Sequence, residues 1–132
     1  MSYRKSAVLL AACGAAALSA PAAHAQRISP MVAGRFVQFC NAPRGGQQVC
    51  DAYISGMADS YALVQKTART SGGAIKPDIC VPTSTSGAAM RGMVVSWIEA
   101  HKDRMSNKVG EVVYLALHDS YPCDAAKSGG PG

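Results

Sequence analysis

The fold is decided by residues 80–123, CVPTSTSGAAMRGMVVSWIEAHKDRMSNKVGEVVYLALHDSYPC. Between the two terminal cysteines, apolar residues recur at steps of three and four in two successive runs, which predicts two helices. The first run is Met90, Val94, Trp97, Ile98 and His101, and the second is Met105, Val109, Val112, Val113, Ala116 and Leu117. If these helices pack antiparallel, Cys80 and Cys123 come to the same end, where a disulfide would close the hairpin.

Two further helices are expected before this segment. Ser29-Pro30 is a good helix opening, because serine caps a helix and proline is tolerated at its first position. This helix would run to about Cys40, with Val32, Phe36 and Phe39 on its buried face. The second helix would run from about Gln47 to Thr70 and end at Ser71-Gly72-Gly73. Its helical stripe is Val49, Tyr53, Met57, Tyr61 and Val64, widened by Cys50, Ile54 and Ala58.

The later hairpin supplies the third and fourth helices. Thr85 or Ser86 would cap the third, which runs to about Lys102. A break near residues 101–104 leads into the fourth, about residues 103–120, and Pro122 ends it. The sequence therefore predicts an all-α fold: a small single-domain bundle of about four helices braced by two disulfides.

The N-terminus has the features of a signal peptide. Arg4 and Lys5 precede an apolar run, and Ala23-His24-Ala25 matches the small-x-small pattern of a cleavage site. We expect residues 1–25 to be removed, residues 26–123 to form the helical domain, and residues 124–132 to be a disordered tail. A lipoprotein alternative, with Cys13 lipidated, is disfavoured because the apolar region before Cys13 is very short. No later segment is long and apolar enough to span a membrane.

The cysteine count agrees with export. The chain has five cysteines, and removing Cys13 leaves Cys40, Cys50, Cys80 and Cys123. Four cysteines in an exported domain of this size indicate two disulfides. Three pairings exist, and we favour 40–50 with 80–123 because each closes one helical hairpin. There is no C-x-x-C, and the domain has only two histidines, so we expect no metal site.

Charge and side-chain chemistry favour a binding protein over an enzyme. After residue 25 there are 11 Lys and Arg against 8 Asp and Glu, and the basic residues are scattered, so nucleic-acid binding is not indicated. His101 lies near Asp103, and His118 lies beside Asp119, but neighbours on a helix point apart and make a poor catalytic set. Asp51 with Asp59, or Glu99 with Asp103, could be paired catalytic carboxylates. Charged residues on the solvent-facing side of a helix are the commoner explanation. No nucleotide-loop or other cofactor motif is present, so we expect no cofactor and no catalysis.

Three motifs in order resemble the Rap/Tai family of immunity proteins, which act against type VI secretion amidase effectors. Residues 50–59 match its C-x-x-Y-I-x-G-x-x-D segment, residues 79–82 are similar to its F-C-x-P, and residues 116–123 are similar to its closing A-L-x-x-x-F-P-C. Between them, residues 94–98 occupy the place of its apolar third helix. The resemblance covers residues 31–123. This sequence departs from the family pattern at two positions. Lys102 stands where the family often has a proline, and Gly110 stands where it often has an alanine.

The resemblance implies a periplasmic inhibitor that binds and occludes a peptidoglycan amidase toxin, and it allows a homodimer. A loop late in the family's helical domain enters the toxin cleft. The matching positions here are His101, Lys102, Asp103, Arg104, Ser106 and Asn107. The alternative function is a small periplasmic helical chaperone or stress protein. Such chaperones depend on titrating carboxylates, and the eight acidic residues and basic balance of this chain disfavour that alternative.

Overall fold

The protein is all-α, as the sequence predicts. The computed structural model describes residues 28–43, 45–73 and 75–123. The elements are α1 (Ala33–Asn41), α2 (Gly46–Thr70), α3 (Gly87–Ala100), the short 3-10 helix η1 (Lys102–Arg104) and α4 (Val109–Ser120). The expected signal peptide and C-terminal tail lie outside the described residues, so both stay predictions.

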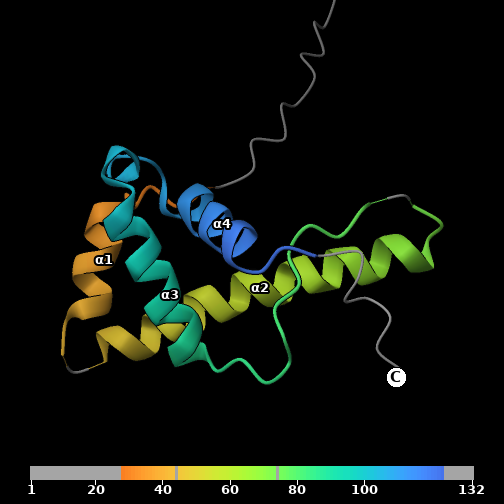
Figure 1. The fold of residues 1–132 in the computed structure, drawn as a ribbon, viewed down its shortest axis with the longest axis horizontal. Coiled ribbons are helices and arrows are strands. Elements are labelled where there is room, and N and C mark those ends of the chain that lie inside the picture. Colours follow the sequence, from red (N-terminus) through yellow and green to blue (C-terminus); the bar gives the residue numbers. More distant parts are fainter. Residues whose placement is uncertain (1–27, 44, 74, 124–132) are drawn as a thin grey trace, which may run out of the picture.

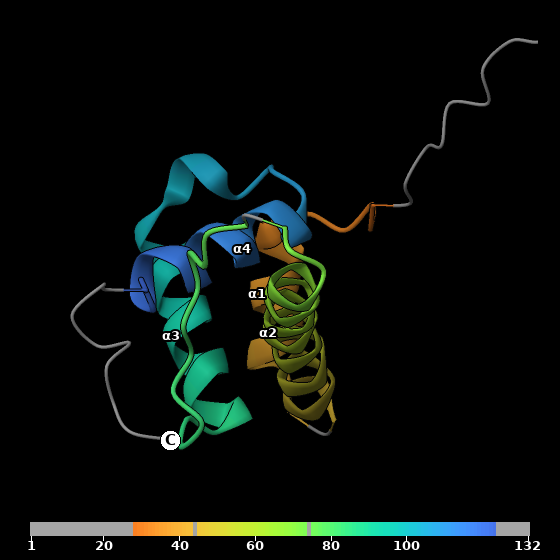
Figure 2. The same ribbon diagram turned by 90° about the vertical axis from the view of Figure 1, so that its right-hand side faces the viewer.

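The long helix α2 is the element on which the others pack. Figure 1 shows α1 and α3 against its N-terminal half, while α4 lies over its middle. Figure 2 looks nearly along α2 and shows α3 beside it, with α4 above; α2 and α3 are in direct contact. The core that these helices enclose is built from small and medium side chains. Its largest fully buried members are Ile54, Ile98, Leu117, Val94, Val109, Val112, Val113, Cys40 and Cys50.

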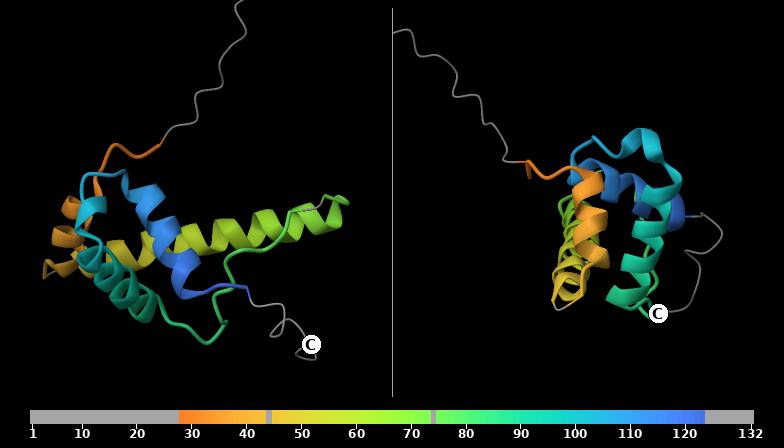
Figure 3. Two further views of the ribbon diagram at one scale, coloured as in Figure 1. Left: turned by 45° about the horizontal axis from the view of Figure 1, so that its top comes forward. Right: turned by 90° about the vertical axis from the view of Figure 1, so that its left-hand side faces the viewer.

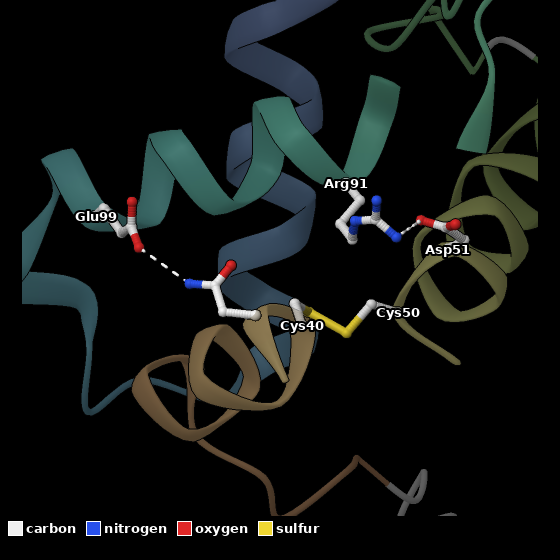
Figure 4. Close-up of a disulfide and its surroundings, with 6 residues drawn as sticks. Cys40, Cys50, Asp51, Arg91 and Glu99 are labelled. Carbon is white, nitrogen blue, oxygen red and sulfur yellow. Dashed lines mark hydrogen bonds and ion pairs between the residues drawn. A yellow bond between two sulfur atoms is a disulfide. The ribbon is translucent and has the colours of Figure 1, made fainter. Parts of the chain in front are cut away.

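Both disulfides form with the pairing favoured from sequence. Cys40 at the end of α1 is bonded to Cys50 in the first turns of α2, with 5.5 Å between their Cα atoms (Figure 4). Cys80 is bonded to Cys123, with 5.0 Å between their Cα atoms. The second bond is reinforced by the backbone, because the Cys80 N–H donates to the Tyr121 carbonyl at 2.8 Å. Each disulfide closes a hairpin of helices.

Two predicted helix starts are wrong. The first helix begins at Ala33 and not at Ser29-Pro30, and Ser29 does not cap it. The fourth begins at Val109 and not near residue 103. The cause is shared, because Val32 and Lys108, the residues just before the two helices, have extended backbones and form an isolated antiparallel bridge with each other. The predicted cap of the third helix is correct at Ser86, whose hydroxyl accepts from the Ala89 N–H at 3.1 Å.

The predicted buried faces are partly wrong. Phe39 is 41% exposed, and Val49 and Val64 are 55% and 53% exposed. On α2 the predicted members Cys50 and Ile54 are fully buried, and Tyr53, Met57 and Tyr61 pack against the core as partly buried side chains, while Gln65 is a buried residue that the stripe did not include. The disulfide to α1 holds Cys50 in the core.

Candidate functional site

The segment between α3 and α4 is held in place by its backbone. Its carbonyl groups cap α1: the Ala33 N–H donates to the Asn107 carbonyl and the Gly34 N–H to the Met105 carbonyl, both at 2.9 Å. The first N–H groups of a helix lack partners within the helix, so these bonds satisfy donors that would otherwise be orphaned. The Val109 N–H donates in turn to the Met31 carbonyl at 2.9 Å. We call residues 101–108, which this network fixes against the start of α1, the α3–α4 loop.

The side chains of this loop are mostly free to meet a partner. Lys102, Asp103 and Ser106 are exposed, and Arg104 and Asn107 are half-buried. The Arg104 Nε lies 3.2 Å from an Asp103 carboxylate oxygen. An exposed ion pair of this kind contributes little to stability, about 0–1 kcal/mol. All six loop residues predicted from the sequence lie in this one segment.

His101 begins the loop and is fixed by packing. Its ring stacks on the Trp97 indole with 3.7 Å between ring centroids, and its Nδ1 lies 2.7 Å from the Trp97 carbonyl oxygen. Trp97 Nε1 donates to an Asp119 carboxylate oxygen at 3.2 Å, and His118 Nδ1 lies 3.1 Å from the other. Hydrogen bonds from His118 and Trp97 outweigh burial and hold the pKa of Asp119 below its ordinary value. No hydrogen bond or ion pair joins His101 to Asp103.

An apolar groove of about 470 Å³ adjoins the loop. It lies between α2, α4 and the chain before α1. Its lining residues are Ile28, Ser29, Tyr53, Met57, Tyr61, Lys108, Gly110, Glu111 and Tyr114. Lys108 belongs to both loop and groove, and the Asn107 side chain donates to Glu111 at 3.3 Å. Loop and groove are therefore one continuous surface. The tyrosine and methionine side chains that line it are partly buried, and the charged residues Lys108 and Glu111 are exposed.

One wall of the groove is fixed by Tyr114. Its hydroxyl donates to the Asp78 carboxylate at 2.7 Å, and its ring stacks on Tyr61 with 5.1 Å between centroids. The hydrogen bond to Asp78, followed by burial, raises the pKa of Tyr114 to about 12. The phenol is therefore neutral and donates throughout the physiological pH range. This contact ties α4 to the connection that follows α2.

Three of the four carboxylates that could have formed acid–base pairs, Asp51, Glu99 and Asp103, have other partners. Asp51 lies 3.0 Å from the Arg91 guanidinium, and Glu99 accepts from Asn41 at 3.4 Å (Figure 4). In residues 28–43, 45–73 and 75–123, no three His, Cys, Asp or Glu side chains gather as they would to hold a metal ion. Within the same ranges, no helix is both long enough and apolar enough to cross a membrane.

Sequence reasoning missed the contacts between distant side chains. The bonds Tyr114–Asp78 and Trp97–Asp119 join residues 36 and 22 positions apart, and the buried Gln65 side chain donates to the Ile79 carbonyl at 3.3 Å. No local pattern marks such pairs. The sequence shows the helical spacing of Tyr53, Met57 and Tyr61. It does not show that Tyr114 lies opposite them.

Together, the fold and surface define a small disulfide-braced helical protein that displays a fixed polar loop beside an apolar groove, as a protein-binding module does. The chain belongs to the family of Rap1a immunity proteins, whose family model matches residues 32–123. It is therefore an immunity protein that acts against a secreted effector. Comparison with curated proteins and with solved structures gives no significant match.

Proposed function

We propose that this chain is a periplasmic immunity protein that binds and occludes a peptidoglycan amidase delivered by type VI secretion. Family membership supports an effector as the partner. The resemblance of residues 50–59, 79–82 and 116–123 to the Rap/Tai proteins supports an amidase as that effector. Two disulfides are typical of a protein that works in an oxidising compartment, which supports the periplasm.

One observation carries the occlusion mechanism: the α3–α4 loop is anchored by its backbone while its side chains stay exposed. The hydrogen bonds from Ala33 and Gly34 fix the loop before any partner arrives. A preorganised loop loses little conformational entropy on binding, which favours affinity. Lys102, Asp103 and Arg104 present both signs of charge at its tip, and complementary charge gives an interface its specificity and association rate.

The groove beside the loop extends the proposed contact surface. Tyrosine and methionine are enriched in protein interfaces, and Tyr53, Met57, Tyr61 and Tyr114 lie together here. We expect the loop to enter the effector's cleft while the groove packs against the cleft's apolar edge. Inhibition then follows from steric exclusion of substrate and needs no catalytic group on this chain.

The test begins with the oxidised chain, residues 26–132, as bait in an envelope extract of cells whose type VI system is active. A stoichiometric amidase, identified by mass spectrometry, is the expected partner. Calorimetry with that purified amidase then compares the wild type with the triple variant Lys102→Ala/Asp103→Ala/Arg104→Ala. We expect affinity to fall at least about tenfold, because truncating charged contacts in an interface costs this much or more.

The matched control is Lys76→Ala, which changes net charge by the same amount at an exposed position away from the loop. It should bind the amidase like the wild type. Both variants should unfold at the wild-type temperature, since the truncated side chains contribute little packing. Unchanged affinity in the triple variant would show that the loop is not the contact.

A further inference from the structure

The end of α2 projects from the body of the molecule and carries an unbalanced charge. Figures 1 and 3 show the C-terminal half of α2 extending beyond α1 and α3. We call residues 62–73 and 75–77, which end α2 and begin the connection after it, the α2 tip. Residues 62–77 contain three cations, Lys66, Arg69 and Lys76, and no aspartate or glutamate. After residue 25 the chain has 11 Lys and Arg against 8 Asp and Glu, so the net positive charge lies entirely in this segment.

The three cations of the α2 tip are exposed and have no counter-charge. None of them forms an ion pair with another described residue. The carboxylates nearest in sequence are Asp59 and Asp78, which bound the tip on either side. Asp78 accepts the hydrogen bond from the Tyr114 hydroxyl, and Asp59 precedes Lys66 by about 10 Å of helix. The positive charge of the tip is therefore directed to solvent.

Large apolar side chains lie among these cations. Leu63, Val64 and Ile75 are 63%, 53% and 52% exposed. Leu63 stands two positions before the buried Gln65, which is about 200° around the helix, so Leu63 points away from the molecule. Lys66 follows Leu63 by three positions and is its neighbour on the same side of the helix. The exposed side of the helix is therefore both apolar and cationic.

The turn after α2 brings Ile75 and Lys76 to the same end of the molecule. Gly72 has a φ of 71°, a left-handed conformation that glycine adopts without strain. The Gly73 N–H donates to the Ala68 carbonyl at 2.7 Å, which closes the end of the helix. Ile75 and Lys76 follow directly after this turn, so they extend the exposed surface that begins at the end of α2.

We propose that the α2 tip docks on the surface of a membrane that contains anionic phospholipid. Segments that bind at a membrane surface combine exposed apolar side chains, which enter the headgroup region, with cations that meet the lipid phosphates. The α2 tip has both. An acidic protein is the alternative partner. The projecting shape favours the membrane, because an exposed end reaches a flat surface without needing a matching cavity.

Docking by the tip holds the α3–α4 loop away from the membrane. Figure 1 shows α1 and η1 at the opposite end of α2 from the tip. A docked chain therefore presents its loop to the aqueous space. The inference goes beyond the proposed function and does not rest on it, because the tip shares no residue with the loop or its groove and needs only a lipid surface.

Co-sedimentation with lipid vesicles measures this docking. The purified oxidised chain, residues 26–132, is mixed with vesicles of phosphatidylglycerol and phosphatidylcholine in equal parts, or with vesicles of phosphatidylcholine alone. We expect the chain to sediment with the anionic vesicles at low salt and to be released as the salt concentration rises, because salt screens the lipid charge. It should stay in the supernatant with the neutral vesicles.

Removing the charge of the tip should weaken this binding strongly. Each cation near an anionic surface contributes about fivefold to partitioning, so Lys66→Gln/Arg69→Gln/Lys76→Gln should bind about a hundredfold more weakly. Leu63→Ser keeps the charge but removes an apolar side chain, so it should weaken binding about threefold or more. Circular dichroism should show that both variants keep the helical fold, because all the truncated side chains are exposed.

The matched control removes three cations from the other end of the molecule. Arg35→Gln/Lys102→Gln/Arg104→Gln has the same net charge as the tip variant, but its changes lie on α1 and in the α3–α4 loop. It should bind the anionic vesicles like the wild type. If it loses binding as much as the tip variant does, net charge alone accounts for the effect and the proposal is wrong.

Two other results would overturn the proposal. One is a wild type that does not sediment with anionic vesicles at low salt. Soluble envelope proteins that then retain the wild type, but not the tip variant, would identify an acidic protein as the partner. The other is unchanged binding in Leu63→Ser, which would show that no apolar side chain enters the lipid. Failure of effector binding would leave these results unchanged, since no effector is present in the assay.

Discussion

The backbone N–H of Gly34 donates a 2.9 Å hydrogen bond to the carbonyl oxygen of Met105, so the start of α1 and the α3–α4 loop form one unit. Gly34 and Met105 also approach each other closely. A Cβ added at Gly34 would lie 3.3 Å from that carbonyl oxygen and 3.4 Å from the Met105 sulfur. A side chain at this position would therefore require Met105 to shift by a few tenths of an ångström.

Gly34→Val should destabilise the protein and displace the loop. The branched side chain would push Met105 outward, and overpacking of this kind costs about 1–3 kcal/mol. The matched control is Gly92→Val on α3, where an added Cβ meets no atom within 4 Å. There the change should be neutral or slightly stabilising, since glycine is the poorer helix former. Urea denaturation of both variants measures the difference, and equal stabilities would contradict the close contact.

The two faces of α2 predict opposite responses to truncation. Ile54 is fully buried, so Ile54→Ala should reduce the free energy of unfolding by about 2–5 kcal/mol. Leu63 is 63% exposed, so Leu63→Ala should change it by no more than about 0.5 kcal/mol in dilute solution. Chemical denaturation at micromolar concentration separates the two. A large loss for Leu63→Ala would mean that this side chain is packed in the folded monomer.

Much of this fold is predictable because its information is local. Helical periodicity, the Ser86 cap and the cysteine spacing predict four helices and the correct disulfides. The starts of α1 and α4 are not predictable in this way. Each depends on the bridge between Val32 and Lys108, which lie far apart in sequence. Local propensity at Ser29-Pro30 favours a helix, and the tertiary contact overrides it.

The same distinction holds for the candidate site. The loop residues His101–Asn107 are adjacent in sequence, so a break between two helices, together with the family resemblance, was enough to name them as candidates. The groove is assembled from three parts of the chain, and only the packing of α4 on α2 brings Tyr114 to Tyr61. On α2, the sequence pattern correctly placed Cys50 and Ile54 on the buried face but wrongly added Val49 and Val64, which are exposed.

The Tyr114–Asp78 contact predicts a dependence of stability on high pH. The pKa of Tyr114 is raised to about 12 from 10, so its neutral form is favoured in the folded state. This stabilisation is fully present below pH 10 and is lost as the pH rises toward 12. Absorbance at 295 nm should show one tyrosine titrating near pH 12 in the folded protein.

Two variants test whether the titration near pH 12 belongs to Tyr114 and depends on Asp78. Tyr114→Phe should remove it. Asp78→Asn should move it to lower pH, because the charged acceptor is the largest cause of the raised pKa. Tyr53, whose pKa is raised by burial alone, supplies the comparison. If the highest transition survives in Tyr114→Phe, then the hydrogen bond to Asp78 does not hold that proton.

The two disulfides should differ in both accessibility and contribution. Cys40 and Cys50 are buried, at 1% and 0% exposure, whereas Cys80 is exposed. A limiting amount of a soluble thiol should therefore reduce Cys80–Cys123 first, because exchange requires access to a sulfur atom. Trapping free thiols with iodoacetamide at intervals, followed by peptide mass mapping, measures the order. Alkylation appearing first at Cys40 and Cys50 would contradict it.

Removing each bond by paired Cys→Ser substitution tests its effect on stability. The chain-entropy model gives about 3 kcal/mol for the shorter Cys40–Cys50 loop and about 4 kcal/mol for the longer Cys80–Cys123 loop. Serine at buried positions 40 and 50 also introduces hydroxyl groups into the core, which costs a further 1–3 kcal/mol or so for each group left without a partner. We therefore expect the Cys40→Ser/Cys50→Ser variant to be the less stable of the two, despite its shorter loop. Thermal unfolding ranks the variants, and the reverse order would show that loop entropy outweighs core burial in this protein.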